Sequence, residues 1–204
     1  MRPLAGLLIA YLAGSIPFAY LAGKLFKGID LRQHGSGNLG ATNVVRVMGW
    51  KIGAVVMLLD MAKGALPVLL LPPKLAPVNT ELWAIAFGVA AIVGHVRSVF
   101  LLWKGGGKGV ATAGGVFLAL APVASLVSLA VFAAVVYLSG YVSLGSLFGA
   151  VTLTLAVVLM KGASSPITIA SALVTLFVFW THRANIGRLR RGEENRIRGA
   201  RPAT

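Results

Sequence analysis

Long apolar runs separated by short polar segments make up most of the chain. Runs of about 20 apolar residues can cross a bilayer as helices, and the sequence predicts such helices over residues 4–23, 52–71, 82–96, 142–160 and 167–181. A further run, residues 110–138, is longer than one span needs. Pro122 cannot donate to a helical ladder, and it disfavours helical dihedrals in the residue before it. We therefore expect this run to break between Ala121 and Pro122 into two helices.

The distribution of basic residues predicts the orientation. With seven spans and the N-terminus outside, 15 Lys and Arg residues lie in cytoplasmic segments and three, Arg2, Lys74 and Lys161, lie outside. Cytoplasmic loops carry an excess of Lys and Arg, whereas six spans would place the arginine-rich tail outside. The sequence thus predicts an all-α integral membrane protein of about seven transmembrane helices, with a cytoplasmic C-terminus. Residues 110–121 are too few to cross untilted and predict a partial helix.

The composition agrees with a membrane protein. Hydrophobic residues make up 57% of the chain, and 19 Lys and Arg residues outnumber five Asp and Glu residues. A nucleic-acid-binding protein could carry this charge, but not with so little polar sequence between the charges, so we expect no nucleic-acid partner. The chain has no cysteine, which excludes a thiol nucleophile and a Cys metal site. With no repeat and no soluble segment, residues 1–204 are predicted to form one membrane domain with cytoplasmic loops at about 24–51, 97–112 and 182–204.

The first polar segment contains GSGNLGATNVVR at residues 35–46. Glycines allow a backbone to approach a ligand closely, and a helix that begins near Thr42 would attract an anion at its N-terminus. Arg46 could hold that anion with two parallel hydrogen bonds. The G-x-G-x-x-G spacing formally matches a dinucleotide-binding fingerprint, but no strand precedes it. The other interpretation is an ordinary glycine-rich turn between two spans.

In the second segment, Lys104 and Lys108 flank three glycines just before a predicted helix. This pattern is typical of a phosphate cradle with mobile cationic donors. It is not a Walker A loop, because Gly109 follows Lys108 where Ser or Thr is required. The alternative is a cytoplasmic loop whose lysines lie at lipid headgroups.

The remaining polar residues have simpler interpretations. His182, Asn185 and Arg188 recur every three residues and would share a helix face. Ser143 is followed by an apolar run, where a lone serine is usually a cap. Asp60 and Lys63 lie inside a predicted span and indicate a structural ion pair, with a substrate role as the alternative. The following arginines are predicted to form a solvated tail on anionic lipid: Arg190, Arg191, Arg196, Arg198 and Arg201.

Taken together, these segments resemble the bacterial acyl-phosphate:glycerol-3-phosphate acyltransferases, integral membrane enzymes of phospholipid synthesis. The matching stretches are GSGNLGATNVVR at 35–46, GH…F…KGGGKGVAT at 94–112, and HRANIGRL with GEE at 182–194; GSIPFAYLAGK at 14–24 and D-x-x-K-G at 60–64 also match. The chain departs from the family in two places. It has three glycines between Lys104 and Lys108 where the family usually has two, and Ser98 stands where the family usually has proline.

The resemblance implies that a fatty acyl phosphate donates its acyl group to the 1-hydroxyl of glycerol 3-phosphate, giving lysophosphatidic acid and inorganic phosphate. It implies the cytoplasmic side of the inner membrane, no cofactor and no metal, and as partners the two substrates, membrane lipids and the enzyme that makes acyl phosphate. Catalytic roles fall to Ser36 and His182, and either His182 or the donor phosphate accepts the hydroxyl proton. Contacts to substrate or phosphate are implied for Gly37, Asn38, Thr42, Asn43, Arg46, Lys104, Lys108, Ser143 and Asn185.

Two other classes of membrane protein remain as alternatives. An anion transporter could use a basic face and broken helices, but transporter sites lie near the bilayer midplane, whereas these charges gather at one end. A purely structural membrane protein would not need three glycine-rich polar loops.

Overall fold

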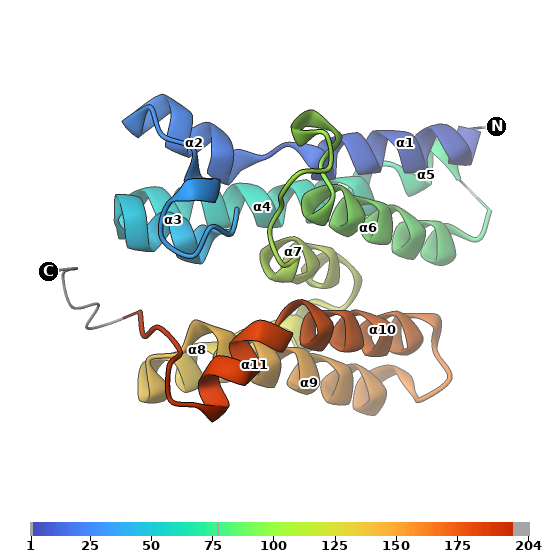
Figure 1. The fold of residues 1–204 in the computed structure, drawn as a ribbon. Coiled ribbons are helices and arrows are strands. Elements are labelled where there is room, and N and C mark those ends of the chain that lie inside the picture. Colours follow the sequence, from blue (N-terminus) through green and yellow to red (C-terminus); the bar gives the residue numbers. More distant parts are fainter. Residues whose placement is uncertain (1, 77, 198–204) are drawn as a thin grey trace, which may run out of the picture. The chain divides into compact units, whose positions relative to one another are not determined.

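The computed structural model describes residues 2–76 and 78–197, and all the regular elements among them are helices (Figure 1). The chain divides after Leu120 into two compact units. The first unit contains α1 (Arg2–Ser15), α2 (Phe18–Lys27), the 3-10 turn η1 (Leu31–Gln33), α3 (Ala41–Met48), α4 (Trp50–Leu70), α5 (Pro72–Leu75), α6 (Thr80–Val96), the 3-10 turn η2 (Val99–Leu101) and α7 (Val110–Leu120). The second contains α8 (Pro122–Ser139), α9 (Val142–Lys161), α10 (Pro166–Thr181) and α11 (Arg183–Arg190).

Several of these helices are long and apolar enough to span a membrane. Within the described residues, five helical segments qualify: Arg2–Lys27, Trp50–Leu75, Thr80–Leu101, Pro122–Ser139 and Val142–Lys161. The pair α10 and α11, bent by 58°, adds a sixth if it counts as one span. The prediction of an all-helical, multi-span protein is confirmed. The count of seven spans, the orientation and the single domain stay predictions, and Arg198 and Arg201 lie outside the described residues.

Prolines mark two of the breaks between helices. The predicted break is confirmed, because α7 ends at Leu120 and Pro122 occupies the first turn of α8. The prediction of one helix over residues 4–23 is wrong in one respect, since Pro17 divides it into α1 and α2. The physical reason is the same in both places: proline lacks the N–H that an uninterrupted helix needs.

The break at Pro17 frees buried carbonyl groups, and side chains from distant segments bind them. The hydroxyl of Ser98 donates to the Ser15 carbonyl at 2.5 Å, and Lys63 Nζ donates to the Ile16 carbonyl at 2.8 Å. A backbone carbonyl buried in a membrane needs such a partner because lipid offers none. Ser98 therefore has a clear structural role at the position where the family usually has proline, and its φ of −69° is one that proline also adopts.

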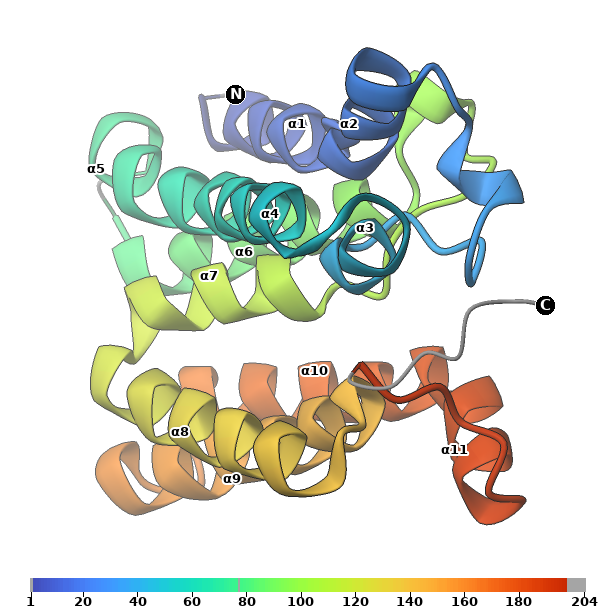
Figure 2. The ribbon, with the colours of Figure 1, turned by 90° about the vertical axis from the view of Figure 1, so that its left-hand side faces the viewer.

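Small residues let the helices of the first unit approach closely. Gly14 of α1 and Gly64 of α4 lie against backbone of the neighbouring helix: a Cβ on Gly14 would overlap Ala91, and one on Gly64 would overlap the Thr112 carbonyl. Accordingly α1 packs on α6 and α4 on α7, as Figure 2 shows. Such contacts are typical of membrane helices, where close packing replaces the hydrophobic driving force.

The second unit is a smaller helical assembly in which α9 packs against both α8 and α10. The hydroxyl of Ser128 donates to the Gly149 carbonyl at 2.7 Å, which joins α8 to α9. The segment after α11 returns to the turn between α8 and α9, where the Ile197 N–H donates to the Gly140 carbonyl at 2.8 Å. This return places residues 193–197 beside the first turn of α9.

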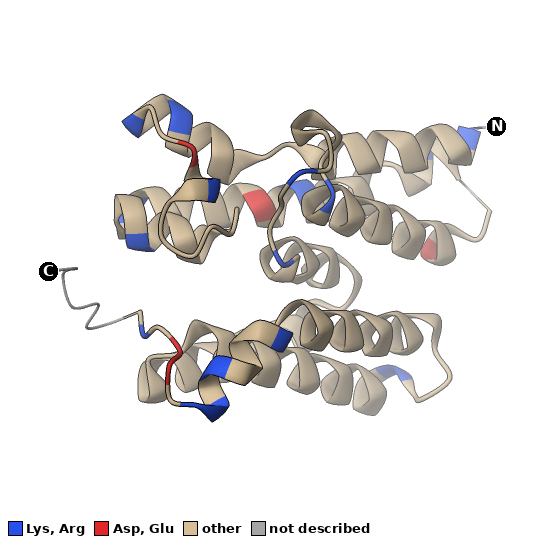
Figure 3. Cartoon of the chain, in the orientation of Figure 1, with Lys and Arg blue, Asp and Glu red and all other residues tan. Residues whose placement is uncertain are grey.

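Charged residues avoid most helix bodies. In each unit, Lys and Arg gather mainly in loops, near helix ends and on the short α11 (Figure 3). The exception lies within α4, whose body carries Asp60 and Lys63. Any anion-binding surface must therefore be built from the loops and the helix ends.

Candidate functional site

In the first unit, two glycine-rich loops that are about 70 residues apart in sequence lie side by side. The loop between α2 and α3 meets the loop between α6 and α7 (Figure 2). The Leu39 N–H and Asn38 Nδ2 both donate to the Gly106 carbonyl, at 3.3 and 3.4 Å. Arg32 Nη1 donates to the Lys104 carbonyl at 3.0 Å. The fold thus brings the first two predicted phosphate-binding segments together.

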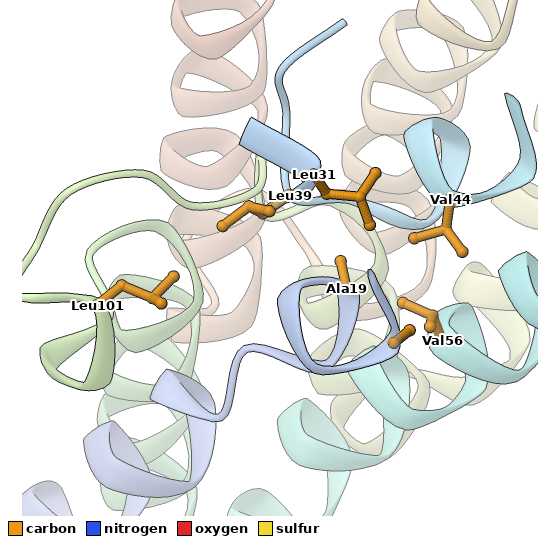
Figure 4. Close-up of a cluster of buried hydrophobic side chains, with 7 residues drawn as sticks. Ala19, Leu31, Leu39, Val44, Val56 and Leu101 are labelled. Carbon is orange, nitrogen blue, oxygen red and sulfur yellow. The ribbon is translucent and has the colours of Figure 1, made fainter. Parts of the chain in front are cut away.

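Apolar side chains from both loops fix them to the helices beneath. Leu31 and Leu39 from the first loop and Leu101 from the second belong to one buried cluster with residues of α2, α3 and α4 (Figure 4). None of these leucines is more than 9% exposed. Burial of a leucine contributes about 1.5–3 kcal/mol, so the polar loops are held by hydrophobic contacts from below.

An ion pair stabilises the turn that begins the first loop. Arg32 Nη2 lies 2.6 Å from Asp30 Oδ2, and the Arg32 backbone N–H also donates to Asp30 Oδ1. The hydrogen bonds with the Arg32 side chain lower the pKa of Asp30 to about 2. Because Arg32 also reaches the Lys104 carbonyl, this pair links the two loops at physiological pH.

Asn43 organises the first loop from within. Its Oδ1 accepts the Ser36 N–H at 2.8 Å, and its Nδ2 donates to the carbonyls of His34 and Leu31 at 3.0 and 3.4 Å. The side chain is buried, with 1% of the residue exposed. Gly35 and Gly37 complete the turn with φ of +63° and +70°, which glycine adopts without steric cost. The predicted substrate contact at Asn43 thus falls on a residue whose amide supports the backbone around Ser36.

The second loop contains two non-glycine residues in left-handed conformation. Leu102 and Trp103 have φ of 52° and 57°, and such conformations cost about 1–3 kcal/mol each. Hydrogen bonds hold this turn: Trp103 Nε1 donates to the Tyr11 hydroxyl at 2.9 Å, which donates to the Arg97 carbonyl at 2.9 Å. The strained turn directly precedes Lys104, and strain of this kind concentrates at functional sites.

The remaining predicted residues of the first unit lie around these loops. Ser36 and Lys104 are exposed, whereas a second set is half-buried: Gly37, Asn38, Thr42, Arg46 and Lys108. Helix α3 begins at Ala41, close to the predicted start, and no side chain caps that start. Thr42 and Arg46 are four residues apart and therefore lie on one side of α3. The Thr42 hydroxyl in the first turn of α3, the Arg46 guanidinium in its last turn and the lysine ammonium groups are donors that suit a phosphate group.

The predicted ion pair inside α4 is confirmed. Lys63 Nζ lies 2.7 Å from Asp60 Oδ1, and both side chains are buried. Sequence reasoning missed a third member, because His95 Nδ1 from α6 lies 3.6 Å from the same carboxylate oxygen. In the sequence, His95 stood near the end of an apolar run and within the GH…F…KGGGKGVAT match, and neither signal pointed to Asp60.

In the second unit, a buried carboxylate collects three side chains. Glu194 Oε1 accepts hydrogen bonds from Asn185 Nδ2 at 2.6 Å and Ser143 Oγ at 2.8 Å, and Oε2 accepts from Arg188 Nε at 2.7 Å. Burial raises the pKa of Glu194, but the hydrogen bonds from Asn185, Ser143 and Arg188 outweigh it, so the pKa lies below its usual range. Ser143 and Asn185, predicted as substrate contacts, are thus both bound to Glu194, which sequence reasoning did not single out.

His182 lies at the bend between α10 and α11 and is 3% exposed. Its Nδ1 lies 2.8 Å from the Val178 carbonyl. A carbonyl can only accept, so Nδ1 carries the proton, and in the neutral ring the lone pair is on Nε2. Of the two neutral tautomers, this is the one that offers Nε2 as a base.

Comparisons with known proteins point in one direction. The family model described as glycerol-3-phosphate acyltransferase matches residues 4–192. Curated proteins named glycerol-3-phosphate acyltransferase include one from Synechococcus sp. (strain CC9902), 49% identical over 94% of this chain and 93% of the relative. Another, from Trichlorobacter lovleyi, is 48% identical over 93% and 94%.

Solved structures agree. The crystal structure of PlsY (YgiH), an integral membrane glycerol 3-phosphate acyltransferase in its glycerol 3-phosphate form, superposes with a TM-score of 0.87 at 36% identity, covering 96% of both chains. Its lysophosphatidic acid form superposes with a TM-score of 0.85 at 35% identity, covering 96% of this chain and 95% of that one.

Proposed function

Because this chain belongs to the glycerol-3-phosphate acyltransferase family, we propose that its acyl donor is a fatty acyl phosphate and that its products are lysophosphatidic acid and inorganic phosphate. The observation that supports the proposal is the contact between the two glycine-rich loops. One loop leads into α3, which carries Arg46, and the other carries Lys104 and Lys108. Both substrates present phosphate there: the donor as a small anion on an apolar chain, the acceptor as glycerol 3-phosphate.

The proposed division of roles follows the geometry. Arg46, Lys104 and Lys108 bind phosphate oxygens through charged hydrogen bonds, helped by Ser36, Gly37, Asn38 and Thr42. Asn43 acts indirectly, because its amide supports the backbone at Ser36 and at His34 before it. In the second unit, His182 is the candidate base, while Ser143 and Asn185 act through Glu194.

The chemistry needs no covalent enzyme intermediate. The 1-hydroxyl oxygen of glycerol 3-phosphate attacks the carbonyl carbon of the acyl phosphate, and the bond from that carbon to the phosphate oxygen then breaks. Phosphate leaves with the bonding electrons, and the hydroxyl proton passes to an oxygen of that phosphate. Preorganised cations and N–H groups stabilise the negative charge that develops on the leaving phosphate.

The acyl donor gives a direct test of this function. Purified protein in detergent, with chelator present, should form lysophosphatidic acid from glycerol 3-phosphate and palmitoyl phosphate, with one inorganic phosphate released per product. Inorganic phosphate should inhibit competitively, since it fits the same cationic loops. Efficient turnover of palmitoyl-coenzyme A, or a strict Mg²⁺ requirement, would overturn the proposal. Turnover without vesicles also separates an enzyme from a transporter.

We further propose that the loop site faces the cytoplasm of the inner membrane, with the N-terminus outside, because 15 basic residues then lie inside and three outside. Single cysteines at Gln33 and Ser164, both exposed positions, test this in a chain without cysteine. An impermeant thiol reagent applied to intact cells should label position 164 and spare position 33. The reverse pattern would contradict the orientation.

A further inference from the structure

The charged group inside α4 has no part in the proposed phosphate chemistry. Asp60 and Lys63 are one turn apart, their side chains are 2% and 4% exposed, and Nζ lies 2.7 Å from Oδ1. The other carboxylate oxygen, Oδ2, is buried with no hydrogen-bond partner within the described residues. A buried ion pair adds little to the stability of a fold, because a protein with apolar residues of equal volume in its place is often as stable or more stable. Another role for the pair must therefore be sought in its contacts.

One contact leads from Asp60 to the lysine–glycine loop, residues 104–109. His95 Nδ1 lies 3.6 Å from Asp60 Oδ1, and the opposite side of the ring faces Gly107. A Cβ on Gly107 would overlap His95 Nε2, and the Gly107 N–H donates to the His95 carbonyl at 3.4 Å. The His95 ring is therefore packed between the buried Asp60 carboxylate and Gly107, the residue directly before Lys108.

A second contact leads from Lys63 to the break between α1 and α2. Its Nζ donates to the Ile16 carbonyl at 2.8 Å and lies 5.4 Å from the centre of the Phe18 ring. The pair thus ties together α4, α6, the break at Pro17 and the lysine–glycine loop. A rearrangement of either charge would move His95 and, through it, Gly107.

From these contacts we propose that Asp60, Lys63 and His95 are positioning residues of the acyl transfer. They hold Gly107 in place and so fix where Lys108 presents its ammonium group to phosphate. We assign none of the three as a catalytic residue. Asp60 contacts Lys63 and His95 and is linked to the loop through the His95 ring. This inference rests on the proposed function, since the loop must bind a substrate phosphate for its position to matter.

A double-mutant cycle between the ring and the loop tests the proposal. Gly107→Ala places a methyl group on His95 Nε2, and His95→Asn removes that atom while keeping an amide near Asp60. Gly107→Ala alone should lower kcat/KM about tenfold or more, chiefly through KM for one phosphate substrate. The double variant should stay within about threefold of His95→Asn alone, because the clash is gone. Independent, multiplicative effects would overturn the proposal.

A second variant asks whether the buried charges themselves matter. Asp60→Asn/Lys63→Gln removes both charges at nearly constant volume, so the fold should survive. We expect KM for one substrate to rise about fivefold or more, with kcat within about twofold. Unchanged constants would overturn the proposal, as would a fall in kcat at constant KM. The control is Ser128→Ala, which breaks an α8–α9 hydrogen bond and should lower only the stability. If Ser128→Ala raises KM as much as Asp60→Asn/Lys63→Gln does for the same drop in Tm, the proposal is also overturned. If Asp60→Asn/Lys63→Gln does not fold, the double-mutant cycle of His95 and Gly107 tests the proposal alone.

Failure of the proposed function has its own signature. Wild-type protein that turns over no acyl phosphate would refute that function alone. In that case, thermal stabilisation by inorganic phosphate still reports the loop, because a bound ligand raises Tm. The shift in Tm at a fixed phosphate concentration should be smaller in Asp60→Asn/Lys63→Gln than in wild type, and an equal shift would overturn the positioning role.

Discussion

Replacing Arg46 or Lys108 with alanine should nearly abolish turnover. Each variant loses one cation from a partly buried, hydrogen-bonded charge pair with phosphate, which costs about 2–5 kcal/mol. That corresponds to about a 30- to 5,000-fold fall in kcat/KM. Ser36→Ala should also lose activity with the fold intact. The measurement is steady-state turnover of palmitoyl phosphate and glycerol 3-phosphate by purified variants.

The control for this result is another basic residue. Arg191 is exposed and pairs with the exposed Glu193, so Arg191→Ala removes one positive charge without touching the loops. Its activity should match wild type, which would separate phosphate binding from the general effect of net charge. Activity within about twofold of wild type for Arg46→Ala or Lys108→Ala, roughly 0.4 kcal/mol, would refute the role of that residue.

The largest stability effect is expected at Glu194. Glu194→Ala leaves the Asn185 amide, the Ser143 hydroxyl and the Arg188 guanidinium without their common acceptor. Loss of a buried carboxylate that accepts three hydrogen bonds should cost on the order of 3 kcal/mol. Thermal unfolding in detergent should show a clear drop in Tm. Glu193→Ala is the matched control: its carboxylate is exposed, so its pair with Arg191 is worth at most about 1 kcal/mol.

The pH dependence of this contact has a definite sign. The folded pKa of Glu194 lies below its usual range, so its ionised form stabilises the folded state at neutral pH. That contribution is present above the unfolded pKa of about 4.3 and is lost as the pH falls through the lower folded pKa. Wild type should therefore lose Tm relative to Glu194→Gln as the pH drops below about 4.5. Parallel Tm curves for the two proteins over this range would contradict the assignment.

Local signals in the sequence predicted much of the fold, and distant contacts account for most of what was missed; the break at Pro17 is the exception, because a local signal marks it. Pro122 breaks its helix through its own ring, so the break could be located from the sequence. Asp60 and Lys63 form their pair within one helical turn. The approach of His95 to that pair depends on how α6 packs against α4, which no short pattern encodes. The Ser143–Glu194 contact joins residues 51 positions apart, for the same reason.

The candidate site shows the same division. The glycine and lysine pattern predicted two phosphate-binding loops, and the start of α3 near Thr42 was foreseen. The contact with substrate at Asn43 was an expectation from the family resemblance. In the structure, Gly35 and Gly37 have positive φ angles, and the loop that they turn directs the Ser36 N–H to the Asn43 amide oxygen. The left-handed pair Leu102 and Trp103 had no signal at all, since neither residue favours that conformation.

The spacing of the buried pair in α4 also bears on how the chain enters the bilayer. Isolated Asp and Lys residues at the centre of a spanning helix would each oppose insertion by about 2.5–3.5 kcal/mol. Asp60 and Lys63 contact each other within α4 itself, before α6 or the break at Pro17 needs to be in place. The newly made segment can thus neutralise its own charges as it leaves the aqueous channel of the insertion machinery. His95 and the Ile16 carbonyl then meet a charge pair that is already formed, when α6 and the break at Pro17 pack against α4 in lipid.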